Sequence, residues 1–117
     1  TYDLRFRRPN QGDYLDNAAI HTIEHILAAT IRNSEYADLV LYFGPMGCRT
    51  GFDLLLVDID YDAAKDLVIK SIDRCQEFAA VPGATAQECG NYQEHDLARA
   101  KQELIKYKQI IQNQKNQ

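Results

Sequence analysis

The sequence lacks several features that would assign it to a large class of proteins. Among its 117 residues, no apolar run approaches the length of a membrane-spanning helix, and no signal-peptide pattern opens the chain. The basic residues are dispersed and are not interleaved with aromatic side chains, which argues against a nucleic-acid surface. No internal repeat and no nucleotide-binding motif is present. We therefore expect a protein that binds neither nucleic acid nor a membrane.

Cysteine is scarce, with three residues, an odd number that cannot all be paired within one chain. This count indicates thiols that are kept for chemistry or packing in a reducing, cytoplasmic compartment. The length predicts one domain. Because the chain begins at Thr1, within what reads as a strand already in progress, we expect residues 1–117 to form a single domain that lacks its N-terminal segment.

The pattern of apolar residues predicts a mixed fold. Alternation and short apolar runs predict strands over residues 2–7, 39–43 and 52–59. Helical spacing predicts helices over residues 17–33, 63–78 and 95–111. Strands that are close in sequence favour antiparallel pairing. We predict an α+β two-layer sandwich, with a mostly antiparallel sheet covered on one face by helices.

The most informative stretch of the sequence is His21-Thr22-Ile23-Glu24-His25. On a helix, His21 and His25 lie at i and i+4, so both imidazoles leave the same face and can reach one metal ion. Glu24 lies at the edge of that face, where it can shuttle protons without being a ligand. This order of residues is the inverted form of the zinc-peptidase helix motif. The alternative is a pair of helix histidines with no metal.

A catalytic metal site of this kind needs a third protein ligand. Cys89 is a candidate because it precedes Gly90 in an irregular stretch that can approach the helix, but a structural thiol is an equal alternative. We expect His95, near the start of a helix, to be a surface or capping residue. Cys75 falls on the apolar side of its helix and is expected to pack in the core. The residues alone leave the set of ligands open.

Another thiol lies between two predicted strands, in Gly44-Pro45-Met46-Gly47-Cys48-Arg49-Thr50-Gly51. The glycines are expected to free the backbone, and Arg49 gives Cys48 an exposed, electropositive setting that favours the thiolate. Cys48 is therefore either a catalytic thiol or a packing residue at a strand end. Arg5, on the polar side of the first strand, is expected to be solvated or to hold a substrate carboxylate or hydroxyl.

These motifs, in this order, resemble those of the S-ribosylhomocysteine lyase (LuxS) family. The segments that carry the resemblance span nearly the whole chain, at residues 3–6 with 9–10, 21–25, 44–52, and 88–92 with 95–97. The chain departs from the family at Tyr42-Phe43-Gly44, where Asp-Ile-Ser is usual. The family also has an N-terminal segment ahead of the first strand matched here.

The resemblance implies roles for the residues singled out above. His21, His25 and Cys89 would hold the metal, Fe²⁺ in the native state with Zn²⁺ or Co²⁺ as substitutes. Glu24 and Cys48 would be the general acid and base. The reaction would cleave the thioether of S-ribosylhomocysteine, by carbonyl migration and β-elimination, to give homocysteine and 4,5-dihydroxy-2,3-pentanedione, the precursor of autoinducer-2.

The resemblance further implies that Arg5 helps to hold the substrate. It implies a homodimer with active sites at the interface between subunits.

Two other functions compete with the lyase: an inverted-motif zinc peptidase, in which a carboxylate would replace the Cys89 ligand, and a metal-binding module without catalytic activity.

Overall fold

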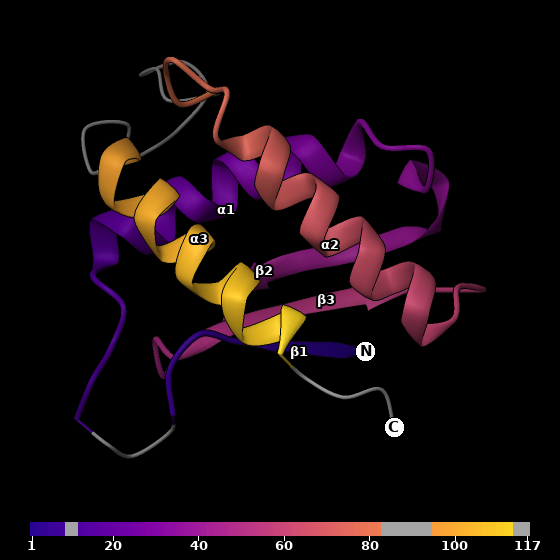
Figure 1. The fold of residues 1–117 in the computed structure, drawn as a ribbon, viewed down its shortest axis with the longest axis horizontal. Helices are drawn as coiled ribbons and strands as arrows, with labels where there is room; N and C mark the ends of the chain where they lie inside the picture. The colour runs from indigo at the N-terminus through magenta and orange to yellow at the C-terminus, as the bar shows by residue number, and fades with distance from the viewer. Residues whose placement is uncertain (9–11, 83–94, 114–117) are drawn as a thin grey trace.

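The structure is a computed structural model, and it describes residues 1–8, 12–82 and 95–113. Its elements follow the chain in the order β1 (Tyr2–Arg5), α1 (Asn17–Arg32), the 3₁₀ helix η1 (Ala37–Leu39), β2 (Val40–Pro45), β3 (Gly51–Leu56), α2 (Tyr61–Cys75) and α3 (Leu97–Gln112). The predicted α+β class is confirmed: one antiparallel sheet packs against three α-helices (Figure 1).

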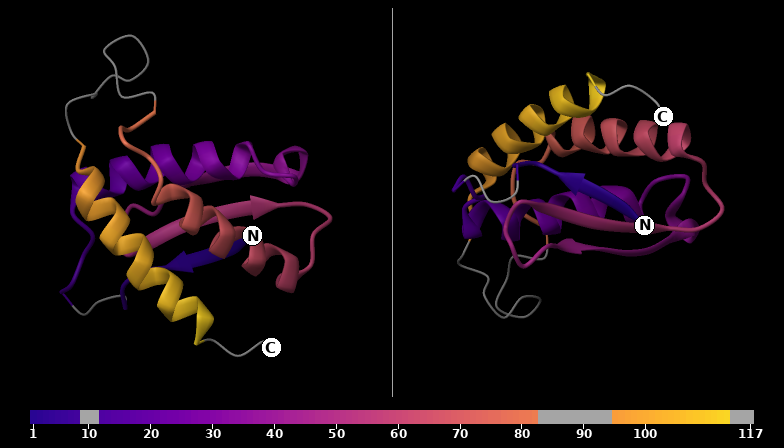
Figure 2. Two further views of the ribbon diagram at one scale, coloured as in Figure 1. Left: turned by 45° about the horizontal axis from the view of Figure 1, so that its top comes forward. Right: turned by 90° about the horizontal axis from the view of Figure 1, so that it is seen from below.

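The sheet has the strand order β1-β3-β2, and both neighbouring pairs are antiparallel. The hairpin of β2 and β3 was predicted, and it turns through the segment that carries Cys48. The helices α2 and α3 lie across one face of the sheet (Figure 2), and α1 packs against β2 and both other helices. No helix in the described part of the chain is long and apolar enough to cross a membrane.

The core forms where one face of the sheet meets the helices. Alternate residues on the strands turn inward, including Leu4, Phe52 and Leu54. On α1, the large apolar side chains with no exposed surface are Ile23, Ile26, Leu27 and Ile31. Each such side chain stabilises the fold by roughly 1.5–3 kcal/mol relative to an exposed one, so this apolar stripe fixes how α1 is rotated. The rotation leaves the histidines on a different, half-buried face of the helix.

Local backbone conformation and capping explain where β3 ends and where α2 begins. The strand predicted over residues 52–59 stops at Leu56, because Asp58 adopts a left-handed backbone with φ 54°. The helix predicted from residue 63 begins at Tyr61, after Asp60 accepts a hydrogen bond from the Ala63 N–H at 2.8 Å. Asp60 is therefore the N-cap of α2.

Candidate functional site

Three imidazoles meet beside α1 and form what we call the histidine cluster: His21, His25 and His95. The rings of His21 and His95 are stacked with centroids 4.0 Å apart, and the His25 ring stands edge-on to both. One ligand nitrogen from each ring lies within 4.8 Å of the others, and all three residues are half-buried. This spacing fits three ligands around one cation.

Hydrogen bonds to the rings favour metal binding through the opposite nitrogens. His25 Nδ1 lies 2.8 Å from the carbonyl oxygen of Pro82, which can only accept, so Nδ1 carries the proton. The Thr22 hydroxyl donates to Ala18 at 2.9 Å, so His95 Nδ1, 3.0 Å away, donates to that hydroxyl. In the neutral imidazole this leaves Nε2 of each ring as the nitrogen that can bind a metal, and protein metal sites commonly hold their histidines in this way.

The position of His95 differs from the sequence expectation of a surface or capping residue. The backbone N–H of Asp96 donates to the Thr22 hydroxyl at 2.8 Å, which ties the start of α3 to α1 and brings His95 over His21. The sequence shows no local signal for this contact, since Thr22 and Asp96 are 74 positions apart. Cys89, the expected third ligand, lies outside the described residues. The three imidazoles of the histidine cluster fit a divalent first-row metal, for which imidazole is a suitable ligand.

Glu24 opens onto a groove of about 370 Å³ that runs along α1 from the histidine cluster. The groove is lined by Glu24, His25, Ala28, Ala29, Arg32, Phe43 and Pro82. Two alanines in the middle of this face leave the space that larger side chains would fill. The sequence analysis did not single out Arg32, although its position eight residues after Glu24 places it on the same side of the helix.

Cys48 belongs to a separate group, the thiol cluster, made of Arg5, Cys48 and Thr50. The Cys48 Sγ lies 3.0 Å from the Thr50 hydroxyl oxygen and 3.8 Å from Arg5 Nη1. Arg5 Nη1 also donates to the Thr50 hydroxyl at 2.5 Å, and the other side of the guanidinium pairs with Asp3 at 2.7 Å. The expectation that Cys48 is exposed and electropositive agrees with this geometry.

The cation beside Cys48 is Arg5 and not the neighbouring Arg49 that the sequence suggested. Arg49 has a left-handed backbone, with φ 60°, and its guanidinium lies over the Tyr14 ring, 5.4 Å from the centroid. Hydrogen bonds from Thr50, followed by the hydrogen bond and charge of Arg5, lower the pKa of the Cys48 thiol. Gly51 allows close packing and not a special backbone conformation, since a Cβ there would collide with the Leu4 carbonyl oxygen of β1.

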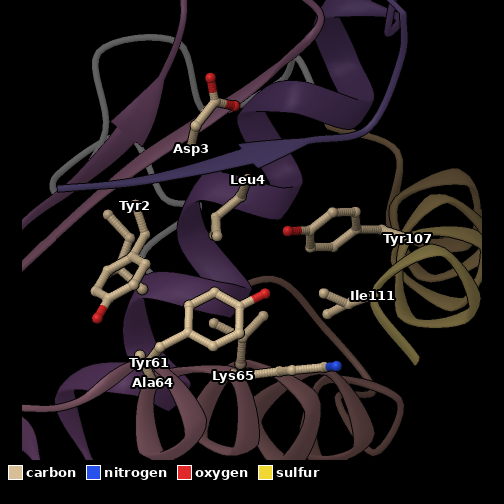
Figure 3. Close-up of a pocket in the computed structure, with 10 residues that line it drawn as sticks. Tyr2, Asp3, Leu4, Tyr61, Ala64, Lys65, Tyr107 and Ile111 are labelled. Atoms are coloured by element: carbon tan, nitrogen blue, oxygen red, sulfur yellow. The ribbon is translucent and has the colours of Figure 1, made fainter. Parts of the chain in front are cut away.

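The two clusters make no direct contact with each other in the described part of the chain. Among the described residues, no hydrogen bond, ring contact or cavity lining connects the histidine cluster or Glu24 to Cys48. A further cavity, of about 60 Å³, lies between β1, α2 and α3 and includes Tyr107 and Ile111 (Figure 3), but none of the predicted catalytic or metal-binding residues lines it.

The sequence model of S-ribosylhomocysteinase (LuxS) matches residues 1–117 of this chain. The chain belongs to the LuxS family. The S-ribosylhomocysteine lyase of Borreliella burgdorferi (strain ZS7) is 47% identical over 121 residues, which cover 100% of this chain and 76% of that protein. That of Desulfotalea psychrophila is 47% identical over 112 residues, covering 92% and 69%. That of Finegoldia magna is 39% identical over 122 residues, covering 100% and 76%.

The structure explains why two departures of this LuxS chain from the expected motif occur together. Tyr42 and Gly44 lie on the face of β2 that turns away from the core, and Tyr42 is 49% exposed. A Cβ at Gly44 would collide with the Tyr42 hydroxyl and ring. Tyr42 therefore lies across the backbone of Gly44, and the position of the ring requires glycine there.

Proposed function

We propose that this LuxS-family chain is an S-ribosylhomocysteine lyase that cleaves the thioether of its substrate to homocysteine and 4,5-dihydroxy-2,3-pentanedione. The observation that carries the proposal is the family match over the whole chain. The histidine cluster and the activated Cys48 thiol add the chemistry that such a cleavage needs. The two products together contain every atom of the substrate, so the reaction requires no oxidant and no water.

We propose that His21, His25 and Cys89 hold Fe²⁺, with Zn²⁺ or Co²⁺ as substitutes. The role of Cys89 rests on the family resemblance, and His95, stacked on His21, provides another imidazole at the same place. When bound, the cation supplies Lewis acidity to a carbonyl oxygen of the substrate. Because Cys48 must remain a thiol, we place the enzyme in the reducing cytoplasm.

Cys48 and Glu24 move the protons. Shifting a carbonyl along the sugar chain takes a proton from the carbon beside it and returns a proton to the former carbonyl carbon. The Cys48 thiolate, held by Arg5 and Thr50, is suited to remove such a proton. Glu24, beside the histidine cluster, is suited to return one. A last proton removal next to the carbonyl expels the homocysteine thiolate from the β carbon.

Arg32 is our candidate for binding the amino-acid end of the substrate. Its side chain is exposed at the end of the groove and has no hydrogen-bond or ion-pair partner among residues 1–8, 12–82 and 95–113. At a rise of 1.5 Å per residue, Arg32 lies about 12 Å along α1 from Glu24. An extended chain of nine bonds, from the sugar aldehyde to the carboxylate, spans about 11 Å. An arginine binds a carboxylate with two parallel hydrogen bonds.

We propose that the enzyme is a homodimer and that each active site combines the histidine cluster of one subunit with the thiol cluster of the other. The lack of a direct contact between the two clusters among the described residues supports this arrangement. Strand β2 also exposes apolar surface at Leu41 and Tyr42, which are 61% and 49% exposed.

The direct test of the function is to incubate the protein with S-ribosylhomocysteine and titrate the thiol that is released. We expect release by the metal-loaded protein and none by Cys48→Ala, which should retain its metal. Release by Cys48→Ala at the wild-type rate would remove this thiol from the mechanism, and no release by the wild-type protein would contradict the proposed activity.

Mixing two inactive variants tests the shared site. In a heterodimer of Cys48→Ala and Glu24→Gln, a shared arrangement leaves one site with both residues intact and one with neither. Equal mixing should then restore about a quarter of the wild-type activity, because half of the dimers are heterodimers with one good site each. If both residues act within one subunit, the mixture stays inactive.

A further inference from the structure

We propose that Thr50 is a positioning residue whose hydroxyl relays the positive charge of Arg5 to the Cys48 sulfur and so holds the sulfur as a thiolate. The inference deepens the proposed lyase function, since it assigns the activation of the catalytic thiol to a hydroxyl group. Three atoms carry it: Arg5 Nη1, Thr50 Oγ1 and Cys48 Sγ.

The direction of the hydrogen bonds follows from what each group can donate. A guanidinium has donors and no acceptor, so Arg5 donates to the Thr50 oxygen, 2.5 Å away. A hydroxyl has one proton of its own, and that proton remains free to point at the sulfur, 3.0 Å away. A hydroxyl that accepts from a cation becomes a stronger donor and a weaker acceptor. The sulfur is therefore the acceptor of this hydrogen bond, and the thiolate is a better acceptor than the thiol.

The direct route from Arg5 to Cys48 is the weaker of the two. Arg5 Nη1 lies 3.8 Å from the sulfur, which is long even for a contact to sulfur, whereas the hydroxyl lies 0.8 Å closer by the two distances. Hydrogen bonding from Thr50 is also the largest cause of the lowered Cys48 pKa, ahead of Arg5. The hydroxyl thus acts on the sulfur more strongly than the guanidinium does by direct contact.

Thr50 is held rigidly enough for this role. Its side chain is 1% exposed, and its carbonyl oxygen accepts from the N–H groups of Phe6 and Arg7 at 2.8 and 2.9 Å. Those residues directly follow β1, the strand that carries Arg5. The same segment of backbone therefore holds both Arg5 and Thr50 in place.

Among the described residues, Arg5 is the charged group that contacts Cys48. Arg5 faces it from β1, with Asp3 paired on the far side of the guanidinium, and Arg49 of the same loop turns toward Tyr14.

The test follows alkylation of Cys48 by iodoacetamide as a function of pH in the full, metal-loaded protein, read by mass spectrometry of the Cys48 peptide. Thr50→Val keeps the shape of the side chain and removes the hydroxyl. We expect the midpoint of the profile to move to higher pH, and the rate below the midpoint to fall about threefold to tenfold. Thr50→Ser restores the hydroxyl and should restore the wild-type profile.

The control is Thr30→Val, which removes a buried hydroxyl that contacts a different cysteine, Cys75, at 3.5 Å. It should leave the Cys48 profile unchanged. A Thr50→Val profile that overlies the wild type, or a Thr50→Ser profile shifted as far as that of Thr50→Val, would overturn the proposal. Alkylation needs no substrate, so it separates this inference from the lyase activity: a protein that fails to release thiol can still show the shifted profile.

Discussion

Glu103 on α3 is a buried carboxylate whose removal should measurably destabilise the protein. It is 1% exposed, and its Oε2 accepts from Arg7 Nη2 at 2.5 Å and from Arg99 Nε at 3.3 Å. Arg7 has further contacts, with the Phe6 carbonyl oxygen and with Asp13. The perturbation we consider is Glu103→Gln, which keeps the shape of the side chain and removes the charge.

The size of the effect follows from the burial of the pair. Removing one partner of a buried ion pair costs about 3–5 kcal/mol when the remaining charge is left uncompensated. Here Asp13 still lies 3.2 Å from Arg7, and the glutamine oxygen can still accept one hydrogen bond, so we expect about 2–3 kcal/mol. At roughly 2.1 cal/mol/K of unfolding entropy per residue, a 117-residue domain loses about 4 °C of Tm for each kcal/mol. The expected fall in Tm is therefore about 8–12 °C.

Thermal unfolding followed by circular dichroism measures this, with Glu35→Gln as the matched control. Glu35 is exposed, and its replacement should change the stability by less than about 0.5 kcal/mol. The double variant Arg7→Met with Glu103→Met should lose less than Glu103→Gln alone, because it leaves no buried charge behind. A Glu103→Gln protein that melts within about 2 °C of the control would refute the reasoning.

The pH dependence gives an independent check of the same pair. Burial opposes the charge of Glu103, but the hydrogen bond and charge of Arg7, with help from Arg99, prevail and lower the pKa of Glu103 below its ordinary value of 4.5. A carboxyl with a lowered folded-state pKa adds stability that is complete above the unfolded-state value and is lost as the pH falls through the folded-state value. The stability gap between wild type and Glu103→Gln should thus be constant near neutral pH and should shrink only below about pH 4.5.

Three more predictions concern the site. His25→Ala should lower the metal content measured by elemental analysis, whereas Thr30→Val on the same helix should not. Arg32→Met should raise KM for S-ribosylhomocysteine about tenfold through the loss of a charge-assisted hydrogen bond, with metal content and Tm unchanged; an unaltered KM would exclude Arg32 from the substrate site. Gly44→Ser should displace the Tyr42 ring, and Gly44→Ser combined with Tyr42→Asp should be more stable to heat than Gly44→Ser alone, since the clash is then absent.

Local patterns in the sequence predicted those parts of the structure that depend on near neighbours. The i, i+4 histidines lie side by side on α1, with centroids 4.8 Å apart, because helix geometry alone brings them together. The hairpin around Cys48 formed as predicted because its strands are adjacent along the chain. The cap of α2 is likewise local, because Asp60 accepts a hydrogen bond from the N–H of Ala63, three residues later.

Contacts between distant parts of the chain escaped the sequence analysis. His95 joins the histidine cluster through a hydroxyl on α1, and the cation beside Cys48 comes from β1 and not from its neighbour in the loop. Both depend on which strand pairs with β3 and on how α3 docks, and neither carries a periodic signal. Arg32 was missed for a different reason: a basic residue in the last turn of a helix is ordinary, and only the groove beside it shows a possible use.

The helix α3 connects the two clusters, and this has a consequence that can be measured. Its start is bound to Thr22 beside the histidine cluster, and seven residues later Glu103 holds Arg7. The N–H of Arg7 donates in turn to the carbonyl oxygen of Thr50, the residue that contacts the Cys48 sulfur. Weakening the ion pair between Glu103 and Arg7 should therefore disturb the thiol cluster. We expect Glu103→Gln to raise the midpoint of Cys48 alkylation in the direction of Thr50→Val, at temperatures where both proteins remain folded. If the alkylation profile of Glu103→Gln matches the wild type while its Tm has fallen, then the ion pair stabilises the fold without positioning the thiol.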